Sequence, residues 1–269
     1  MIRAPLSTTS VLDESADAVR VTGAAWAALL ILTSLPYRFA QAIFIDRLLE
    51  LGGEATHYGN LLGSLARWTM AAFVISRCGR AIYARACRLA TDSGEAPGAI
   101  AWRVPLAALA NYLFLSAIVE SITWLSLMTC LAFPLCVLLS GFAIGTMEMN
   151  EQPSIVMPFR LLAKRTRELR YAAALVLIFA CALVVATINV AFAAGIGLAL
   201  AEASGRVDVP RWTVLLHPDN HRFIAMIIAG GVLAIEPFWI AANVILVRKG
   251  GAVESGEELR VWFEELRRA

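Results

Sequence analysis

The sequence predicts an all-α fold: a polytopic transmembrane helical bundle of about six spans with amphipathic interfacial helices. The strongest observation is that Tyr171 to Ala201 contains no side chain that is charged at neutral pH. A helix rises about 1.5 Å per residue, so about 20 residues cross a hydrocarbon core about 30 Å thick. Apolar side chains make up 59% of the chain and charged ones only 16%, which is not the composition of a soluble domain. Five further apolar runs of helical length indicate the other spans.

The first 45 residues predict a surface helix followed by a span. Residues 1–20 are expected to be a cytoplasmic segment with a short interfacial helix, because Ser10 and Asp13 have the spacing of a helix N-terminal cap. Residues 21–45 are the first span. Pro36 lies inside it and predicts a kink, since proline removes one backbone donor.

The second apolar run, 61–90, is expected to be one helix that crosses the membrane and continues into the cytoplasm. Its second half carries four arginines that fall largely on one side, and we expect them to snorkel to lipid phosphates. Those residues are Arg77, Arg80, Arg85 and Arg88. Whether the helix is continuous is left open. A third span over 100–119, a corner at Glu120 and Ser121, and a fourth span over 122–144 with Pro134 inside it complete this half.

A basic segment precedes the fifth span, 171–201, and is predicted to lie as a helix at the interface. Three roles are open for it: a topology determinant, a site for anionic lipid headgroups, and a docking patch for a cytoplasmic protein partner. The contact candidates are Arg160, Lys164, Arg165, Arg167 and Arg170. Gly195 and Gly197 in the fifth span are expected to permit close helix approach or a bend.

The last span is predicted over 223–247, and the tail, 248–269, as a cytoplasmic amphipathic helix. The domain organisation is therefore 1–20, the transmembrane domain 21–247, and 248–269. On this topology, 17 of the 23 lysines and arginines lie at one side, which predicts both termini in the cytoplasm. The expected location is the cytoplasmic (inner) membrane of a bacterium. No cleavable signal peptide is expected, and the near-balanced net charge of +2 does not indicate a nucleic-acid partner.

Glu236 is the most informative single residue, because a carboxylate near the middle of a span is costly unless it is paired, hydrated or protonated. One interpretation is a proton, cation or substrate site in a hydrated cavity. The other is an internal salt bridge to Arg38 or Arg67. Three asparagines within predicted spans belong to the same class of intramembrane polar candidates: Asn111, Asn189 and Asn243.

His217, Asp219 and His221 have a composition that suits a metal ion. Pro218 disfavours helix at the preceding residue, so the two imidazoles need not share a face, and we expect no metal and no cofactor. The five cysteines have no CxxC spacing and are interpreted as small buried residues. The sequence shows no catalytic motif, so we assign no catalytic residue.

The order of elements resembles that of a known family. It includes Ser10 to Glu14 before a span containing Leu35-Pro36, a span containing Pro134, a basic helix after Glu148, and a proline-bearing last span followed by Arg248. This order resembles the bacterial membrane domain found as the membrane part of some glycerophosphodiester phosphodiesterases and in stand-alone relatives of unknown function. The resemblance implies the membrane fold and carries over no catalytic residue. The chain departs from the family after the last span, where an aromatic and acidic segment is replaced by Leu246-Val-Arg-Lys-Gly.

The functional prediction is a non-enzymatic integral membrane protein that acts as a scaffold or accessory component and binds the lipid bilayer, anionic headgroups or a partner protein. Two alternatives remain open. The first is a transporter or channel-like protein that uses Glu236 with an arginine. The second is a membrane-embedded enzyme acting on lipid, with His217, Asp219 and His221 as its site.

Overall fold

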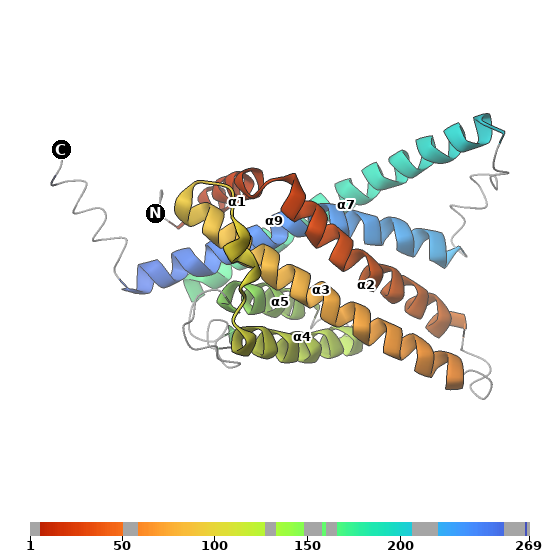
Figure 1. Cartoon of the computed structure of the whole chain (residues 1–269), viewed down its shortest axis with the longest axis horizontal. Helices are drawn as coiled ribbons and strands as arrows, with labels where there is room; N and C mark the ends of the chain where they lie inside the picture. The colour runs from red at the N-terminus through yellow and green to blue at the C-terminus, as the bar shows by residue number, and fades with distance from the viewer. Residues whose placement is uncertain are drawn as a thin grey trace. The chain divides into compact units, whose positions relative to one another are not determined.

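The computed structural model describes residues 6–50, 59–126, 133–147, 158–159, 166–205, 220–255 and 267. Throughout these residues every regular element is a helix (Figure 1), so the all-α prediction is confirmed. In chain order they are α1 (Thr8–Thr22), α2 (Ala24–Glu50), α3 (Gly59–Ser93), the 3-10 helix η1 (Ala99–Trp102), α4 (Leu106–Ser126), α5 (Phe133–Met147), α7 (Thr166–Ala203) and α9 (His221–Ser255).

Three of the described helices are long and apolar enough to cross a bilayer, through Leu106–Thr123, Leu169–Ala203 and Arg222–Gly250. The number rises to four if α1 and α2, which meet at a bend of 94°, form one span. Both numbers are below the predicted six. The second half of α3 carries too many arginines, and the apolar part of α5, Pro134–Thr146, is shorter than the 20 or so residues that a span needs.

The predicted surface helix at the N-terminus is α1, but it begins earlier than the sequence indicated. The Ser7 hydroxyl accepts a hydrogen bond from the Ser10 backbone N–H at 3.1 Å, and the Ser10 hydroxyl accepts one from the Ser7 N–H at 3.2 Å. This reciprocal pair is a capping box, so the prediction that Ser10 and Asp13 cap the helix is wrong.

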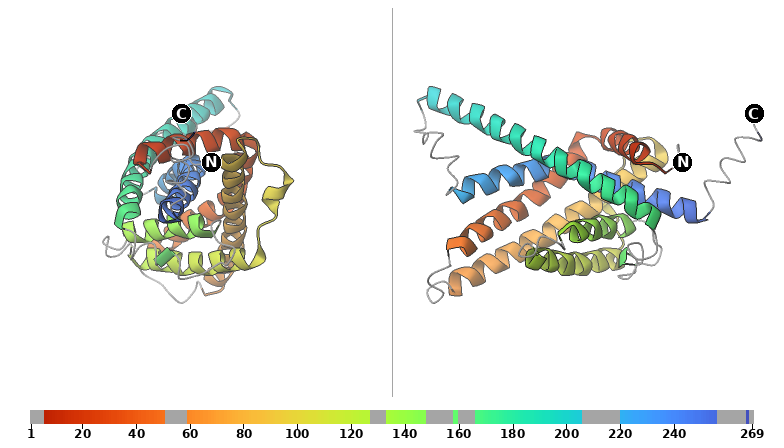
Figure 2. Two further views of the ribbon diagram at one scale, coloured as in Figure 1. Left: turned by 90° about the vertical axis from the view of Figure 1, so that its left-hand side faces the viewer. Right: turned by 180° about the vertical axis from the view of Figure 1, so that it is seen from behind.

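The chain breaks at Gly23, between α1 and α2. Gly23 has φ of 86°, a conformation that side chains with a Cβ rarely adopt, and it separates α1 from α2. Helix α2 then continues through Pro36 to Glu50. The sharp turn from α1 into α2 is visible in Figure 2.

Helix α3 is continuous from Gly59 to Ser93, which answers the question that the sequence left open. The snorkelling prediction is wrong for two of its four arginines. Arg77 is only 3% exposed and Arg80 only 7% exposed, so both side chains lie within the protein. The charge pattern alone could not show this, because it does not reveal which helices cover that side.

Helix α4 runs without interruption through Glu120 and Ser121, so the predicted corner is wrong. The Ser121 hydroxyl donates to the Ala117 carbonyl at 2.8 Å, and therefore remains bonded within its own helix. Glu120 needs no turn towards water because its carboxylate lies 2.8 Å from the Arg77 guanidinium. The helix also begins later than predicted, at Leu106, after η1.

The chain forms two compact units, and several long helices contribute to both. The first comprises 1–30, 77–179 and 237–269, and the second comprises 31–76 and 180–236. In the first unit, α4 and α5 lie side by side (Figure 1).

Glycines allow close helix contacts within each unit. In the first, a Cβ on Gly145 of α5 would lie 2.7 Å from the Asn243 carbonyl oxygen of α9, and a Cβ on Gly141 would collide with the Asn243 amide. In the second, a Cβ on Gly230 of α9 would lie 2.8 Å from a methyl of Val190 on α7. Nothing lies within 4 Å of a Cβ added at Gly197, so the structure shows no close helix approach at that residue.

Candidate functional site

The second unit contains a buried charge at Glu236, the residue before Pro237 in α9. Proline has no N–H and leaves a backbone carbonyl of the preceding turn without its usual donor. The Glu236 side chain is 1% exposed, so its carboxylate is screened from solvent. A buried carboxylate requires polar partners, because an ion is expensive to remove from water.

Two of these partners come from one turn of α2. The Ser34 hydroxyl donates to Glu236 Oε1 at 3.4 Å, and Arg38 Nη2 lies 3.9 Å from Glu236 Oε2. Residues four apart on a helix face the same way, which is why α2 presents both groups to α9. Arg38, one of the two arginines that the sequence proposed, therefore pairs with Glu236. The other, Arg67, is exposed.

The polar contacts continue to α3 and along α2. The Ser76 hydroxyl of α3 donates to the Ser34 hydroxyl at 3.3 Å, and Arg38 Nη1 donates to Gln41 Oε1 at 2.9 Å. We call Ser34, Arg38, Ser76 and Glu236 the Glu236 cluster. It joins α2, α3 and α9: the Ser34 hydroxyl donates to the carboxylate, Arg38 is ion-paired with it, and Ser76 donates to Ser34.

The asparagine candidates occupy different environments. Asn243 is buried, and its amide donates to the Trp239 carbonyl at 2.8 Å within α9 while it packs against Gly141. Asn111 of α4 is half-buried. Asn189 of α7 is exposed.

Sequence reasoning missed a charged junction in the first unit, which we call the α1 junction: Glu14, Asp92, Arg248 and Lys249. Lys249 of α9 is 2% exposed, and its Nζ lies 2.7 Å from Glu14 Oε1 and donates to the Ser10 hydroxyl at 3.1 Å. Arg248 is ion-paired with Asp92 at the end of α3. The sequence contains one indication of this junction: Ser10 and Glu14 are one helical turn apart and therefore lie on the same side of a helix. This spacing does not identify Lys249 as the partner of Glu14.

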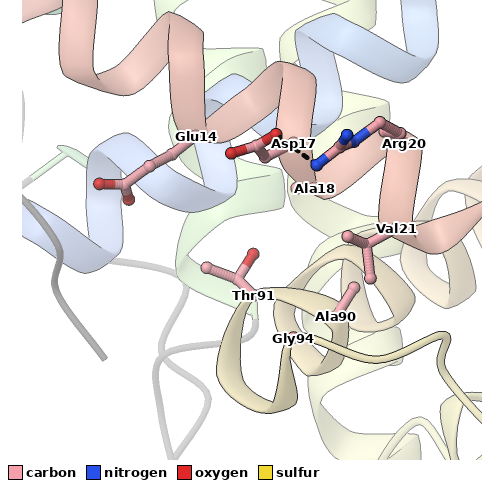
Figure 3. Close-up of a pocket in the computed structure, with 8 residues that line it drawn as sticks. All are labelled: Glu14, Asp17, Ala18, Arg20, Val21, Ala90, Thr91 and Gly94. Carbon is pink, nitrogen blue, oxygen red and sulfur yellow. Dashed lines mark ion pairs between the residues drawn. The ribbon is translucent and has the colours of Figure 1, made fainter.

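A cavity of about 170 Å³ lies beside this junction, between α1 and the end of α3 (Figure 3). Glu14, Asp17 and Arg20 line it from α1, and Thr91 and Gly94 line it from the other side. Asp17 and Arg20 already form an ion pair at 3.2 Å. None of the residues of the Glu236 cluster lines this cavity.

Several of the predicted contact residues fall outside the described part. Arg160, Lys164 and Arg165 lie there, Arg167 belongs to the first turn of α7, and Arg170 is exposed. The role of this basic segment stays a prediction.

The predicted metal-site candidates also fall largely outside the described part. His217 and Asp219 lie outside the described residues, and His221 begins α9. Within the described residues, no group of three His, Cys, Asp or Glu side chains is placed to hold a metal ion. Of the cysteines in that part, Cys87 and Cys136 are buried, whereas Cys181 is exposed and departs from the prediction.

Comparisons with known proteins do not assign this chain to a family. No protein-family model, curated protein or solved structure matches the chain. The resemblance to the membrane part of glycerophosphodiester phosphodiesterases therefore stays an expectation from the sequence.

Proposed function

We propose that this protein is a multi-pass component of a bacterial cytoplasmic membrane that acts as a non-catalytic scaffold, binding lipids or partner proteins. In this proposal the chain crosses the bilayer six times with both termini in the cytoplasm. Some of the six crossings come from segments that are not long and apolar enough by themselves. These segments are the first half of α3, and α5 with neighbouring residues. The excess of lysine and arginine at one side supports this orientation.

The observation that carries the proposal is that the charged side chains of the Glu236 cluster are shielded from solvent. A transport site needs its charged groups to face a hydrated path, where a solute or ion can replace the protein's own contacts. Here the carboxylate of Glu236 is 1% exposed and the Arg38 side chain 17% exposed, and they face one another. Such contacts hold helices together in a membrane, each contributing about 1 kcal/mol.

Carboxyl labelling in sealed membrane vesicles tests this proposal. A water-soluble carbodiimide with a tagged amine should leave Glu236 unmodified and should modify Glu202, which is exposed at the end of α7. Glu202 is the matched control, because it shows that the reagent reaches this protein. Peptide mass spectrometry measures both positions in one sample.

The variant Glu236→Gln separates the scaffold from the transporter. If Glu236 is a structural partner, the substitution lowers the melting temperature of the purified protein and leaves ion and solute flux in proteoliposomes at the level of empty vesicles. Efficient labelling of Glu236, together with flux that depends on its carboxylate, would establish the transporter and overturn the scaffold.

Lipid binding is tested at the basic segment. Replacing Arg160, Lys164, Arg165, Arg167 and Arg170 by glutamine should reduce the anionic lipid retained by the protein in native mass spectrometry. The control replaces Arg206, Arg211 and Arg222, which the topology assigns to the opposite side. If both variants retain equal amounts of anionic lipid, the basic segment acts only as a topology determinant.

A further inference from the structure

The connection between α3 and α4 exposes apolar side chains next to the start of a candidate span. In η1, Ile100 and Trp102 are each 54% exposed, whereas Ala101 between them is fully buried. Leu106, the first residue of the candidate span Leu106–Thr123, is 83% exposed. The exposed apolar surface therefore continues from the span onto η1, and Figure 2 (left) shows the yellow segment that contains η1 standing out from the helices.

A contact between two tryptophans relates η1 to the start of a second apolar helix. Trp26 lies in the first turn of α2, and its ring centroid is 5.5 Å from that of Trp102. Helix α2 belongs to the bent pair that can form a fourth span, so the starts of two candidate spans meet at these rings. Tryptophan is enriched at the level of the lipid headgroups, because its ring is apolar and its N–H is polar.

Two arginines lie beside the exposed part of η1. The Arg85 Nε of α3 is 3.5 Å from the Ile100 carbonyl oxygen, and this contact holds the Arg85 guanidinium next to η1. Arg103 directly follows Trp102, and its side chain is exposed. A guanidinium presents several N–H donors in one plane, which suits the oxygens of a phosphate group.

The charges around η1 and the end of α3 are predominantly basic. Residues 84–105 contain two acidic side chains, Asp92 and Glu95. Asp92 is ion-paired with both Arg88 and Arg248. The surface beside the two tryptophans therefore combines an excess of positive charge with exposed apolar area, which is the complement of an anionic lipid.

We propose that η1, with Trp26, Arg85 and Arg103, binds the headgroup of an anionic phospholipid in the cytoplasmic leaflet. We call this the η1 site. The arginines contact the phosphate, the tryptophan rings lie at the glycerol level, and the acyl chains continue along α4 from Leu106. The inference rests on the proposed membrane placement, and it adds a lipid site that is separate from the basic segment before α7.

The test is photo-cross-linking of the full chain in phospholipid nanodiscs with two phosphatidylglycerol probes. One carries a diazirine in its headgroup and the other at the end of an acyl chain. Peptide mass spectrometry should find the headgroup probe on residues 99–106 and the acyl-chain probe on α7. If α7 is labelled but 99–106 are not, the η1 site is wrong and the membrane placement stands. If the acyl-chain probe does not label α7, the membrane placement itself is wrong.

Substitutions test the role of charge at the η1 site. Arg103→Gln should reduce headgroup cross-linking of 99–106 by about fivefold, without changing the melting temperature. Arg103→Lys, which keeps the charge, should retain most of the cross-linking. Arg20→Gln removes the same charge from an exposed position on α1 and is the matched control. Cross-linking that Arg103→Gln leaves unchanged, or that Arg20→Gln reduces equally, overturns the proposal.

Competition identifies the ligand. Unlabelled phosphatidylglycerol should reduce the cross-linking of 99–106 more than phosphatidylcholine does, because the choline cation is repelled by the arginines. Inorganic phosphate should have no effect, since it offers nothing to the apolar part of the site. Equal competition by the two lipids, or displacement by inorganic phosphate, would overturn the assignment to an anionic phospholipid.

Discussion

Lys249 of α9 forms a buried ion pair with Glu14 of α1, with 2.7 Å between Nζ and Oε1. The lysine side chain is 3% exposed and the glutamate side chain 15% exposed, so water screens the pair weakly. This contact, with the bond from Lys249 to the Ser10 hydroxyl, fastens the N-terminal helix to the end of the last helix.

Lys249→Met should therefore detach α1 and lower the free energy of unfolding. Removing one member of a buried pair leaves the other charge without compensation, which costs about 3 kcal/mol. Thermal unfolding in detergent measures the loss, and limited proteolysis should show faster cleavage near Gly23. The control is Arg20→Gln, because the Arg20 and Asp17 side chains are 80% and 56% exposed and their pair should contribute little. Equal effects of the two substitutions would contradict a special role for Lys249.

The pair of Arg77 and Glu120 should be asymmetric in its response to substitution. Arg77 is 3% exposed at its side chain and Glu120 is 25% exposed, with 2.8 Å between them. Glu120→Ala leaves a charge in the more buried position, so it should destabilise the protein more than Arg77→Met does. The double variant should be less destabilised than the sum of the single ones by at least about 1 kcal/mol, measured in a double-mutant cycle. Additive effects would mean that the two side chains do not interact.

Gly145→Ala should destabilise the contact of α5 with α9. The added Cβ would meet the Asn243 carbonyl oxygen at 2.7 Å, a backbone atom that cannot move away cheaply. We expect a loss of about 1–3 kcal/mol, as is typical of overpacking. Gly197→Ala adds the same methyl group where nothing lies within 4 Å, and it should leave the melting temperature unchanged or slightly raised. A tolerated Gly145→Ala would show that α5 can shift away from α9.

The Cys87 thiol should resist modification over a wide pH range. Cys87 is buried in the second half of α3, outside the candidate spans, and burial raises its pKa from 9.0 to about 12. Maleimide labelling of the native protein should therefore remain slow between pH 7 and 9 and become fast only on unfolding, since the thiolate is the reactive form.

The same shift predicts a loss of stability in alkali. Cys87 holds its proton more tightly in the folded chain than in the unfolded one, so its contribution is fully present below about pH 9 and is lost as the pH rises towards 12. A Cys87→Ala variant should lose less stability than the wild type over that interval. Rapid labelling of native Cys87 at neutral pH would show that the site opens.

The sequence by itself determined the helical class and the position of the longest apolar helices. The uncharged run 171–201 becomes α7, and 223–247 lies within α9, because local composition suffices to specify a helix that lipid can surround. It also named Arg38 and Arg67 as candidate partners of Glu236, since a carboxylate in an apolar span is costly unless it is paired, hydrated or protonated.

Tertiary structure decided which of the polar residues meet. Arg38 pairs with Glu236, Glu120 pairs with Arg77 instead of ending a helix, and Lys249 reaches Glu14 from the far end of the chain. Each of these outcomes depends on which helix faces are adjacent in space. Helical periodicity specifies the side on which a residue lies, but only packing specifies what lies against that side.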